Sequence, residues 1–298
     1  MREGNIKGYL MVAGAALCWG IMGTLARFLF TSQEVSPLVL TTIRATLAFP
    51  ILFLVLLIWN RQHLQVRLSD LPLLAIVGIG GLAMANFTYY YTISLTNVAT
   101  AILLQYMAPI IVALFSVAFL GERMTWVTLT SLALAIGGDF LMVKGYDPQA
   151  LRLNLPGIIS GILAACAFAF YTLISKKAIE RMDSWTLLTY AYAFAALFWW
   201  IVVPPWAIAS QGYSLRLWGI FFVIAAFGTV LPFGLYVRGL VYLPATKVSI
   251  VSTLEPVVAA VAAFSVLGEH LSLFQSFGGF MVLAGVVLIQ RRGKKERV

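Results

Sequence analysis

The sequence has few charged residues. Only 10% of its 298 residues are Asp, Glu, Lys or Arg, whereas 61% are hydrophobic and the mean hydropathy is +0.95. Soluble domains carry roughly 25% charged residues, and a fold of this size has no room to bury so much apolar surface. The composition therefore excludes a soluble globular fold and predicts a chain whose surface is covered largely by lipid.

Histidine and cysteine are also scarce, with two residues of each. His63 and His270 fall in expected loops, and Cys18 and Cys166 lie singly in expected membrane spans. These positions offer no Cys/His metal site, no disulfide framework and no nucleophile–histidine pair within the membrane. We therefore expect the chain not to be an enzyme and to bind neither a metal nor another cofactor.

The sequence is rich in long apolar segments. A helix needs ~20 apolar residues to cross the ~30 Å of hydrocarbon in a bilayer. Ten such segments use almost the whole chain and leave no stretch for a soluble domain. The predicted fold class is an all-α polytopic membrane protein with ten transmembrane helices. The predicted spans are 7–30, 36–59, 71–93, 98–119, 125–144, 155–178, 184–206, 216–240, 245–267 and 272–290.

The formal net charge of +9 does not indicate nucleic-acid binding, because of where the charges lie. If the N-terminus is cytoplasmic, fifteen Lys and Arg residues fall on the cytoplasmic side and four outside, with Arg44 within the second span. This bias sets the orientation of membrane proteins. We expect a multi-pass protein of the cell inner (plasma) membrane with both termini in the cytoplasm and its basic tail against anionic lipid headgroups.

The chain repeats itself after 147 residues. Residues 103–125 then overlie 250–272, so that Pro109 meets Pro256 and the Leu-Gly-Glu of 120–122 meets that of 267–269. The same shift pairs Tyr89 with Tyr236, Gly81 with Gly228 and Gly138 with Gly285; a shift of 149 pairs Trp19 with Phe168 and Arg27 with Lys176.

This pattern predicts two repeats of five spans, 1–150 and 151–298. Because five is odd, the second repeat must cross the bilayer in the opposite sense to the first. Inverted repeats of this kind are typical of alternating-access secondary transporters. A channel is the less favoured alternative, because no filter-like loop is visible in the sequence.

These residues resemble the drug/metabolite transporter superfamily, specifically its EamA-type members with two five-helix repeats. The resemblance rests on the doubled proline followed twelve residues later by Gly-Glu, on ALCWG at 16–20 and on LEPVVAA at 254–260. It implies a ten-helix basket whose spans 1, 3, 4, 6, 8 and 9 surround a central cavity. It also implies export of amino acids or related metabolites, with drugs and sugar or nucleotide derivatives as alternatives.

The two matched prolines, Pro109 and Pro256, predict helix breaks near the middle of spans four and nine. Proline lacks an N–H and clashes with the carbonyl four residues earlier, which here belongs to Gln105 or Ser252. Unsatisfied backbone at this depth is tolerated where protein or a wet cavity satisfies it. The breaks therefore indicate a transport site, although bending for packing is the alternative.

Two ionisable side chains lie at membrane depth and are functional hypotheses by default. Glu255 precedes Pro256 and is expected either to bind an ammonium group, to exchange a proton, or to hold the broken span in place through hydrogen bonds. Arg44 is expected to pair with Asp139, which the topology places at a similar depth; recognition of a carboxylate by its guanidinium is the alternative.

Aromatic residues of the middle spans, among them Tyr89, Tyr106 and Phe233, are further candidates for lining a cavity. Buried tyrosine hydroxyls need hydrogen-bond partners, which a polar substrate supplies. Packing is the competing interpretation for each one.

In the Leu-Gly-Glu turns, we expect a left-handed glycine and a glutamate that accepts from backbone donors at helix ends. The residues expected to line a cavity for a small molecule, with proton coupling as an option, are Trp19, Tyr90, Gln105, Tyr171, Ser252 and Glu255.

Overall fold

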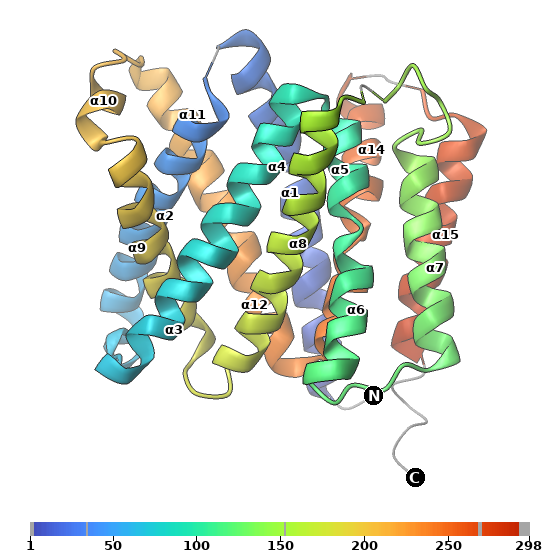
Figure 1. Ribbon diagram of the computed structural model, residues 1–298, viewed down its shortest axis with the longest axis horizontal. Helices are drawn as coiled ribbons and strands as arrows, with labels where there is room; N and C mark the ends of the chain where they lie inside the picture. The colour runs from blue at the N-terminus through green and yellow to red at the C-terminus, as the bar shows by residue number, and fades with distance from the viewer. Residues whose placement is uncertain (1–2, 34, 152, 268–269, 292–298) are drawn as a thin grey trace.

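The computed structural model describes residues 3–33, 35–151, 153–267 and 270–291, and within these ranges it contains helices and no strand. Figure 1 shows the helices running side by side across one bundle. The elements up to residue 142 are α1 (Glu3–Ser32), α2 (Pro37–Trp59), η1 (Arg61–Leu64), η2 (Leu68–Asp70), α3 (Leu71–Ala75), η3 (Ile76–Ala83), α4 (Met84–Leu95), α5 (Val98–Gln105), α6 (Ala108–Phe119) and α7 (Trp126–Met142). Those that follow are α8 (Leu155–Ala178), α9 (Ser184–Val202), α10 (Pro205–Ala209), α11 (Leu215–Ala225), η4 (Ala226–Val230), α12 (Leu231–Tyr242), α13 (Ala245–Ser252), α14 (Leu254–Leu267) and α15 (Leu273–Arg291).

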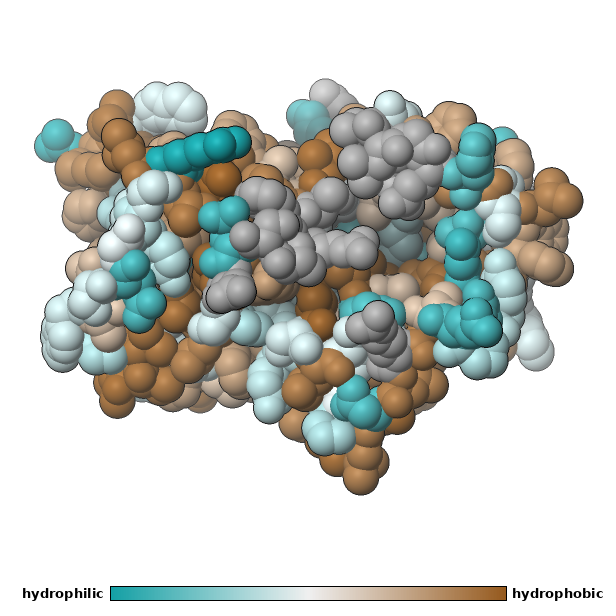
Figure 2. All heavy atoms as spheres, turned by 90° about the horizontal axis from the view of Figure 1, so that it is seen from above, coloured by the Kyte–Doolittle hydropathy of each residue, from teal (hydrophilic) through white to brown (hydrophobic). Residues whose placement is uncertain are grey.

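The expected fold class is confirmed. Within the described ranges, nine helical segments are long and apolar enough to cross a membrane, and α7 is a shorter apolar helix. Apolar side chains such as Ile162, Leu163 and Phe280 point outward from these segments, with Phe280 71% exposed. Seen along the helices, hydrophobic side chains occupy several parts of the rim (Figure 2). An outer surface of this kind suits lipid rather than water.

The third and eighth spans each contain a π-helical stretch, η3 between α3 and α4 and η4 between α11 and α12. The matched glycines Gly81 and Gly228 both lie in these stretches. A π-helical turn accommodates more residues than an α-helical turn and frequently occurs at functional sites. The predicted spans are continuous helices here. Glycines are the local signal within η3, whereas η4 is also followed closely by Pro232.

The fourth and ninth spans are interrupted. Helix α5 ends at Gln105 and α6 begins at Ala108, while α13 ends at Ser252 and α14 begins at Leu254. Pro109 stands in the first turn of α6, where the N–H that it lacks would have no partner within the helix. Pro256 stands at the same place in α14. Each proline therefore follows a break and begins a new helix.

The helices pack in pairs that correspond between the two halves of the chain. Helix α1 packs against α12 and α14, and α8 packs against α4 and α6. Helices α7 and α15 form a pair at one side of the bundle (Figure 1), and glycines bring their backbones together. A Cβ atom at Gly285 would lie 2.8 Å from the Ser131 carbonyl oxygen, and one at Gly278 would lie 2.7 Å from the Gly138 carbonyl oxygen. Small residues permit this close contact.

The first and last described helices meet at one end of the bundle, the lower end in Figure 1. There the Tyr9 hydroxyl donates to the Ile289 carbonyl oxygen at 3.2 Å. Helix α1 therefore begins, and α15 ends, on the same side of the molecule. We call this side the terminal end.

Two charged side chains hold the connection between α12 and α13 at the terminal end. The Glu122 carboxylate accepts from the backbone N–H groups of Ala245 and Thr246, at 2.6 and 3.2 Å. The Lys176 ammonium donates to the carbonyl oxygens of Leu240 and Leu243, at 2.5 and 3.0 Å. We call Glu122, Lys176 and the backbone that they bind the clasp.

The clasp confirms the expected chemistry of the first Leu-Gly-Glu turn and shows which helix end its glutamate binds. Gly121 has the expected left-handed conformation, with φ 66°. Glu122, however, caps α13 in the other half of the chain, whereas Thr125 caps the nearby α7 by accepting from the Thr128 N–H at 3.2 Å. The second turn, at 267–269, includes Gly268 and Glu269, which lie outside the described residues.

Candidate substrate cavity

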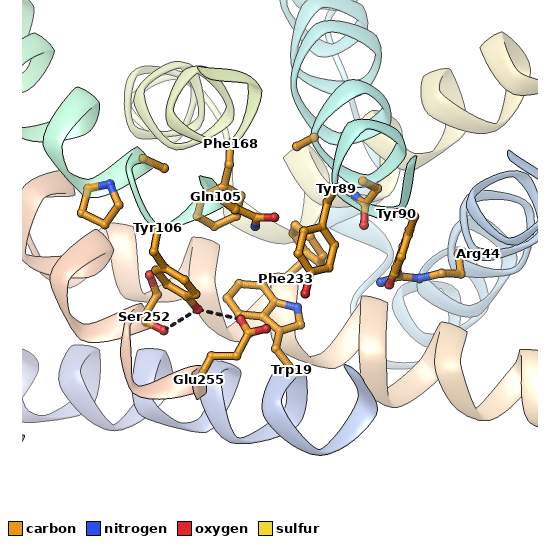
Figure 3. Close-up of a pocket in the computed structure, with 14 residues that line it drawn as sticks. Trp19, Arg44, Tyr89, Tyr90, Gln105, Tyr106, Phe168, Phe233, Ser252 and Glu255 are labelled. Atoms are coloured by element: carbon orange, nitrogen blue, oxygen red, sulfur yellow. Dashed lines mark hydrogen bonds between the residues drawn. The ribbon is translucent and has the colours of Figure 1, made fainter. Parts of the chain in front are cut away.

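A small cavity of about 50 Å³ lies beside the two helix breaks (Figure 3). In this conformation its volume is below the usual range for small-molecule sites. Its walls come from spans one to four, six, eight and nine. The lining residues are Trp19, Arg44, Ala85, Asn86, Tyr89, Tyr90, Gln105, Tyr106, Ala108, Pro109, Phe168, Phe233, Ser252 and Glu255.

Five of the six residues expected to line the cavity do so; the exception is Tyr171. Tyr171 is 1% exposed and packs behind Phe233 and Tyr236, with ring centroids 5.7 and 6.4 Å away. It lies about one helical turn from Phe168, with ring centroids 6.3 Å apart, and the aromatic residues in front of it separate it from the cavity. Of the two prolines, Pro109 lines the cavity, and Pro256 is buried outside it. Which residues bind substrate remains a prediction.

A tyrosine joins the two breaks. The Tyr106 hydroxyl donates to a Glu255 carboxylate oxygen at 2.9 Å and lies 3.1 Å from the Ser252 carbonyl oxygen. The Ser252 hydroxyl is occupied within its own helix, where it donates to the Ser249 carbonyl oxygen at 2.8 Å. Gln105, by contrast, has a buried Oε1 with no donor among the described residues. The break in span four therefore presents an unused acceptor to the cavity.

Arg44 is 4% exposed and binds only neutral acceptors. Its Nε donates to the Thr229 hydroxyl at 2.7 Å, one terminal nitrogen donates to the Gly228 carbonyl oxygen at 2.8 Å, and the other donates to the Tyr90 hydroxyl. The guanidinium carbon lies 4.9 Å from the centre of the Tyr90 ring, which adds a cation–π contact. Arg44 thereby joins α2 to η4 and α4.

The expected pairing of Arg44 with Asp139 is wrong. Helix α2, which carries Arg44, and α7, which carries Asp139, lie on opposite sides of the bundle (Figure 1). The expectation rested on similar depth in the membrane and had no information about which helices are neighbours. Asp139 is 1% exposed, and neither of its carboxyl oxygens has a hydrogen-bond partner within the described ranges.

Aromatic rings form one wall of the cavity. The Trp19 ring meets Phe233 and Phe168 edge-on, with centroids 5.1 and 6.1 Å away. Tyr236 lies behind them, 5.5 Å from Phe168, and its hydroxyl is 2.8 Å from the Thr172 hydroxyl. Along α8 and α12, these residues lead from the cavity toward the terminal end. The aromatic wall and the clasp are thus two successive layers between the cavity and that end.

Several lining residues are related by the sequence repeat. The 147-residue shift pairs Gln105 with Ser252, Ala108 with Glu255, and Asn86 with Phe233, and the 149-residue shift pairs Trp19 with Phe168; all eight line the cavity. The cavity therefore lies where corresponding segments of the two halves meet.

Sequence reasoning did not single out two contributors, Asn86 and Gly20. Asn86 lines the cavity from α4. Gly20 lies where α1 meets α14: a Cβ atom there would be 2.8 Å from the Glu255 carbonyl oxygen and 2.9 Å from Val258. Gly20 belongs to the ALCWG stretch, so a signal was present, but only the partner helix explains why a glycine is needed there.

Comparison with known proteins identifies the family that this architecture represents. The sequence model of the EamA-like transporter family matches residues 6–144 and, separately, 155–291. A solved crystal structure superposes with a TM-score of 0.76 over 94% of this chain and 96% of its own, at 20% sequence identity. That likeness supports the fold.

Curated relatives are transporters. The chain is 31% identical to the uncharacterized inner membrane transporter YicL of Salmonella typhimurium, over 97% of both chains. It is 28% identical to the threonine/homoserine exporter RhtA of Escherichia coli, over 89% of this chain and 84% of RhtA. It is 27% identical to a probable terminal-alkyne amino-acid exporter of Streptantibioticus cattleyicolor, over 76% of this chain and 75% of that protein.

Proposed function

The chain belongs to the EamA-like transporter family, and on this premise we propose that it exports amino acids by alternating access. It is a multi-pass membrane protein that carries a small organic molecule. The observation that supports the proposal best is the cavity at two interrupted helices, with the aromatic wall beside it and the clasp toward the terminal end. The names of RhtA and the alkyne amino-acid exporter favour amino acids over drugs and sugar or nucleotide derivatives.

In the proposed mechanism, residues 1–150 and 151–298 are inverted repeats that exchange roles. Three observations support this: the two separate family matches, the lining residues related by the sequence shift, and the corresponding helix pairs α1–α14 and α8–α6. Opening the terminal end requires release of the clasp and separation of the aromatic wall. The opposite end would close at the same time, so that the cavity faces one side at a time.

The orientation is part of the proposal. The distribution of Lys and Arg favours a cytoplasmic terminal end, with both chain termini in the cytoplasm and the tail against lipid headgroups. The proposal includes no catalytic activity and no nucleic-acid partner. Cysteine introduced at Ser69 in the loop before α3, or at Gln211 in the loop before α11, tests the orientation. With Cys18 and Cys166 replaced by serine, we expect a membrane-impermeant thiol reagent applied to whole cells to label position 211 and not 69.

Proton coupling is proposed through Glu255. A cavity carboxylate that binds an ammonium group in one state and a proton in another would exchange the two across the membrane. The test uses proteoliposomes with a pH-sensitive dye inside. We expect a threonine gradient to move protons in the opposite direction; threonine movement with no dye response would indicate facilitated diffusion.

Transport itself is tested by counterflow. Purified protein in liposomes loaded with unlabelled threonine should accumulate external radiolabelled threonine, and the initial rate should saturate with concentration. Protein-free liposomes are the control. Non-saturating flux with electrical conductance would support a channel, and counterflow by drugs or sugar derivatives but by no amino acid would contradict the proposed cargo.

A further inference from the structure

We infer that Arg44 and Glu255 bind the two charged ends of one zwitterionic amino acid, the carboxylate at Arg44 and the ammonium at Glu255. This inference rests on the proposed function, since it assumes that the cargo is an amino acid. It assigns the orientation of the ligand in the cavity and explains selection for a molecule that carries both charges.

Arg44 is a buried cation with no bound anion. Arginine stays protonated in proteins, and in the described part of the chain no carboxylate lies within ion-pair distance of Arg44. Its three hydrogen bonds go to the neutral oxygens of Tyr90, Gly228 and Thr229. A guanidinium has more N–H donors than these bonds use, and it suits carboxylates because its donors lie in one plane. A ligand carboxylate would supply the missing negative charge.

Glu255 is the matching acid on the cavity wall. Its one donor among the described residues is the neutral hydroxyl of Tyr106, and it has no Lys or Arg partner there. A carboxylate accepts several hydrogen bonds. Gln105 adds a second acceptor, the buried Oε1 that lacks a donor. The cavity near the helix breaks therefore holds two acceptors with unused capacity, Glu255 and Gln105, which suit an ammonium group with its several N–H bonds.

The two charges are separated along the cavity. In Figure 3, Arg44 lies at one edge of the labelled group and Glu255 lies beside Trp19, with Tyr89 between the two charged residues. Both charges line the same cavity without pairing with each other. A ligand with only one charged end would leave the opposite protein charge uncompensated, and this is costly away from water. The side chain of the ligand would then face the aromatic wall.

A purely structural role for Arg44 makes a different prediction. Arg44 connects α2 to η4, so its loss would weaken transport of every ligand by a similar factor. A carboxylate-binding role weakens only ligands that have a carboxylate. The same logic separates a structural Glu255 from one that binds ammonium. The decisive measurement is therefore the response of each variant to a series of ligands.

The experiment measures inhibition of radiolabelled threonine counterflow by three unlabelled compounds. These are threonine, threoninol, which keeps the ammonium and lacks the carboxylate, and N-acetylthreonine, which keeps the carboxylate and lacks the ammonium. With the wild-type protein, we expect both analogues to inhibit at least ~10-fold more weakly than threonine, because each loses a charge-assisted contact.

The variants assign the two contacts. In Arg44→Gln, threonine should weaken by at least ~10-fold while threoninol changes by less than ~2-fold; in Glu255→Gln, threonine should weaken similarly while N-acetylthreonine is unchanged. Arg216→Gln and Glu180→Gln remove exposed charges outside the cavity and should match wild type for all three compounds. Where a variant retains too little counterflow, its inhibition constants come from competition for ligand binding in detergent.

Three results would overturn the inference. Equal inhibition of the wild type by threonine and both analogues would show that neither charge is recognised. Equal weakening of all compounds by Arg44→Gln would make Arg44 structural. If Arg44→Gln does not fold, the wild-type ligand series and Arg44→Lys decide the matter, since Lys keeps the charge and should retain preference for threonine over threoninol. Counterflow by no amino acid at all would instead overturn the proposed function, and the ligand assignment with it.

Discussion

Spans four and nine break at corresponding positions but present different chemistry. Both have a helix end, a short gap and a proline in the first turn of the next helix. Span four brings Gln105, Tyr106 and Ala108 to the cavity, whereas span nine brings Ser252 and Glu255. The acid of span nine thus stands where span four has a methyl group.

This difference separates what the fold requires from what the ligand requires. The shared proline and helix end provide a break in each half, which the proposed alternating-access mechanism would use in both. The side chains that differ make the break in span nine acidic and the break in span four neutral, so a bound molecule has one favoured orientation. Substitutions at the two breaks and at the helix packed against one of them test this separation.

The largest effect is expected from Gly20→Val. The new side chain would meet the Glu255 backbone and Val258, pushing α1 away from α14 at the span-nine break. Overpacking of this kind costs about 1–3 kcal/mol in stability, and we expect counterflow to fall by at least ~10-fold because the cavity wall moves. Gly23→Val on the same helix is a matched control, since a Cβ atom there has nothing within 4 Å. Thermal unfolding in detergent and counterflow measure both, and equal behaviour of the two variants would contradict the prediction.

Gln105→Ala should raise the apparent KM for threonine by about 3–10-fold with little change in thermal stability. The reason is that its buried Oε1 has no partner in the described structure, so its removal costs the empty protein nothing and the bound state a hydrogen bond. Counterflow at several threonine concentrations gives the KM. A lower unfolding temperature with an unchanged KM would mean that Gln105 serves packing.

Tyr106→Phe should weaken transport by about 2–5-fold and lower the unfolding free energy by about 1 kcal/mol. The hydroxyl joins the two breaks through Glu255 and the Ser252 carbonyl oxygen, so its loss affects both the ligand site and the fold. The double variant Tyr106→Phe/Glu255→Gln checks the connection. Strict additivity of the two changes would argue against it, because contacting residues normally couple.

Ser252→Ala should have the smallest effect, below ~2-fold on counterflow. Its hydroxyl donates within α13, and the atom that meets Tyr106 is its backbone carbonyl oxygen, which alanine keeps. Ser252 and Gln105 occupy the same position in the two halves, so their variants form a direct test of the comparison. A KM change for Ser252→Ala as large as that for Gln105→Ala would show that the two breaks contribute alike.

The sequence predicted the membrane fold and much of the cavity because both depend on strong local signals. Apolar runs long enough to cross lipid locate the spans, and prolines matched across 147 residues locate the gaps next to Gln105 and Ser252. These signals also indicate how deep each residue lies in the membrane, which is why Glu255 and Trp19 were expected at the cavity.

The errors came from information that one sequence does not carry. Tyr171 lies one turn beyond Phe168 on α8 and packs behind Phe233, so other aromatic side chains line the cavity in its place. Arg44 and Asp139 share a depth, but their helices are not neighbours. The partner of Glu122 is the N-terminal end of α13, more than a hundred residues away, and no local pattern indicates it.

The clasp at the terminal end has a consequence for timing. Four charge-assisted hydrogen bonds from two side chains hold one short connection, and they attach to both helices that flank it. In the proposed mechanism, opening that side requires the release of all four bonds around this one connection. The rate of that release would then set an upper limit on turnover, however quickly the cargo itself binds or departs.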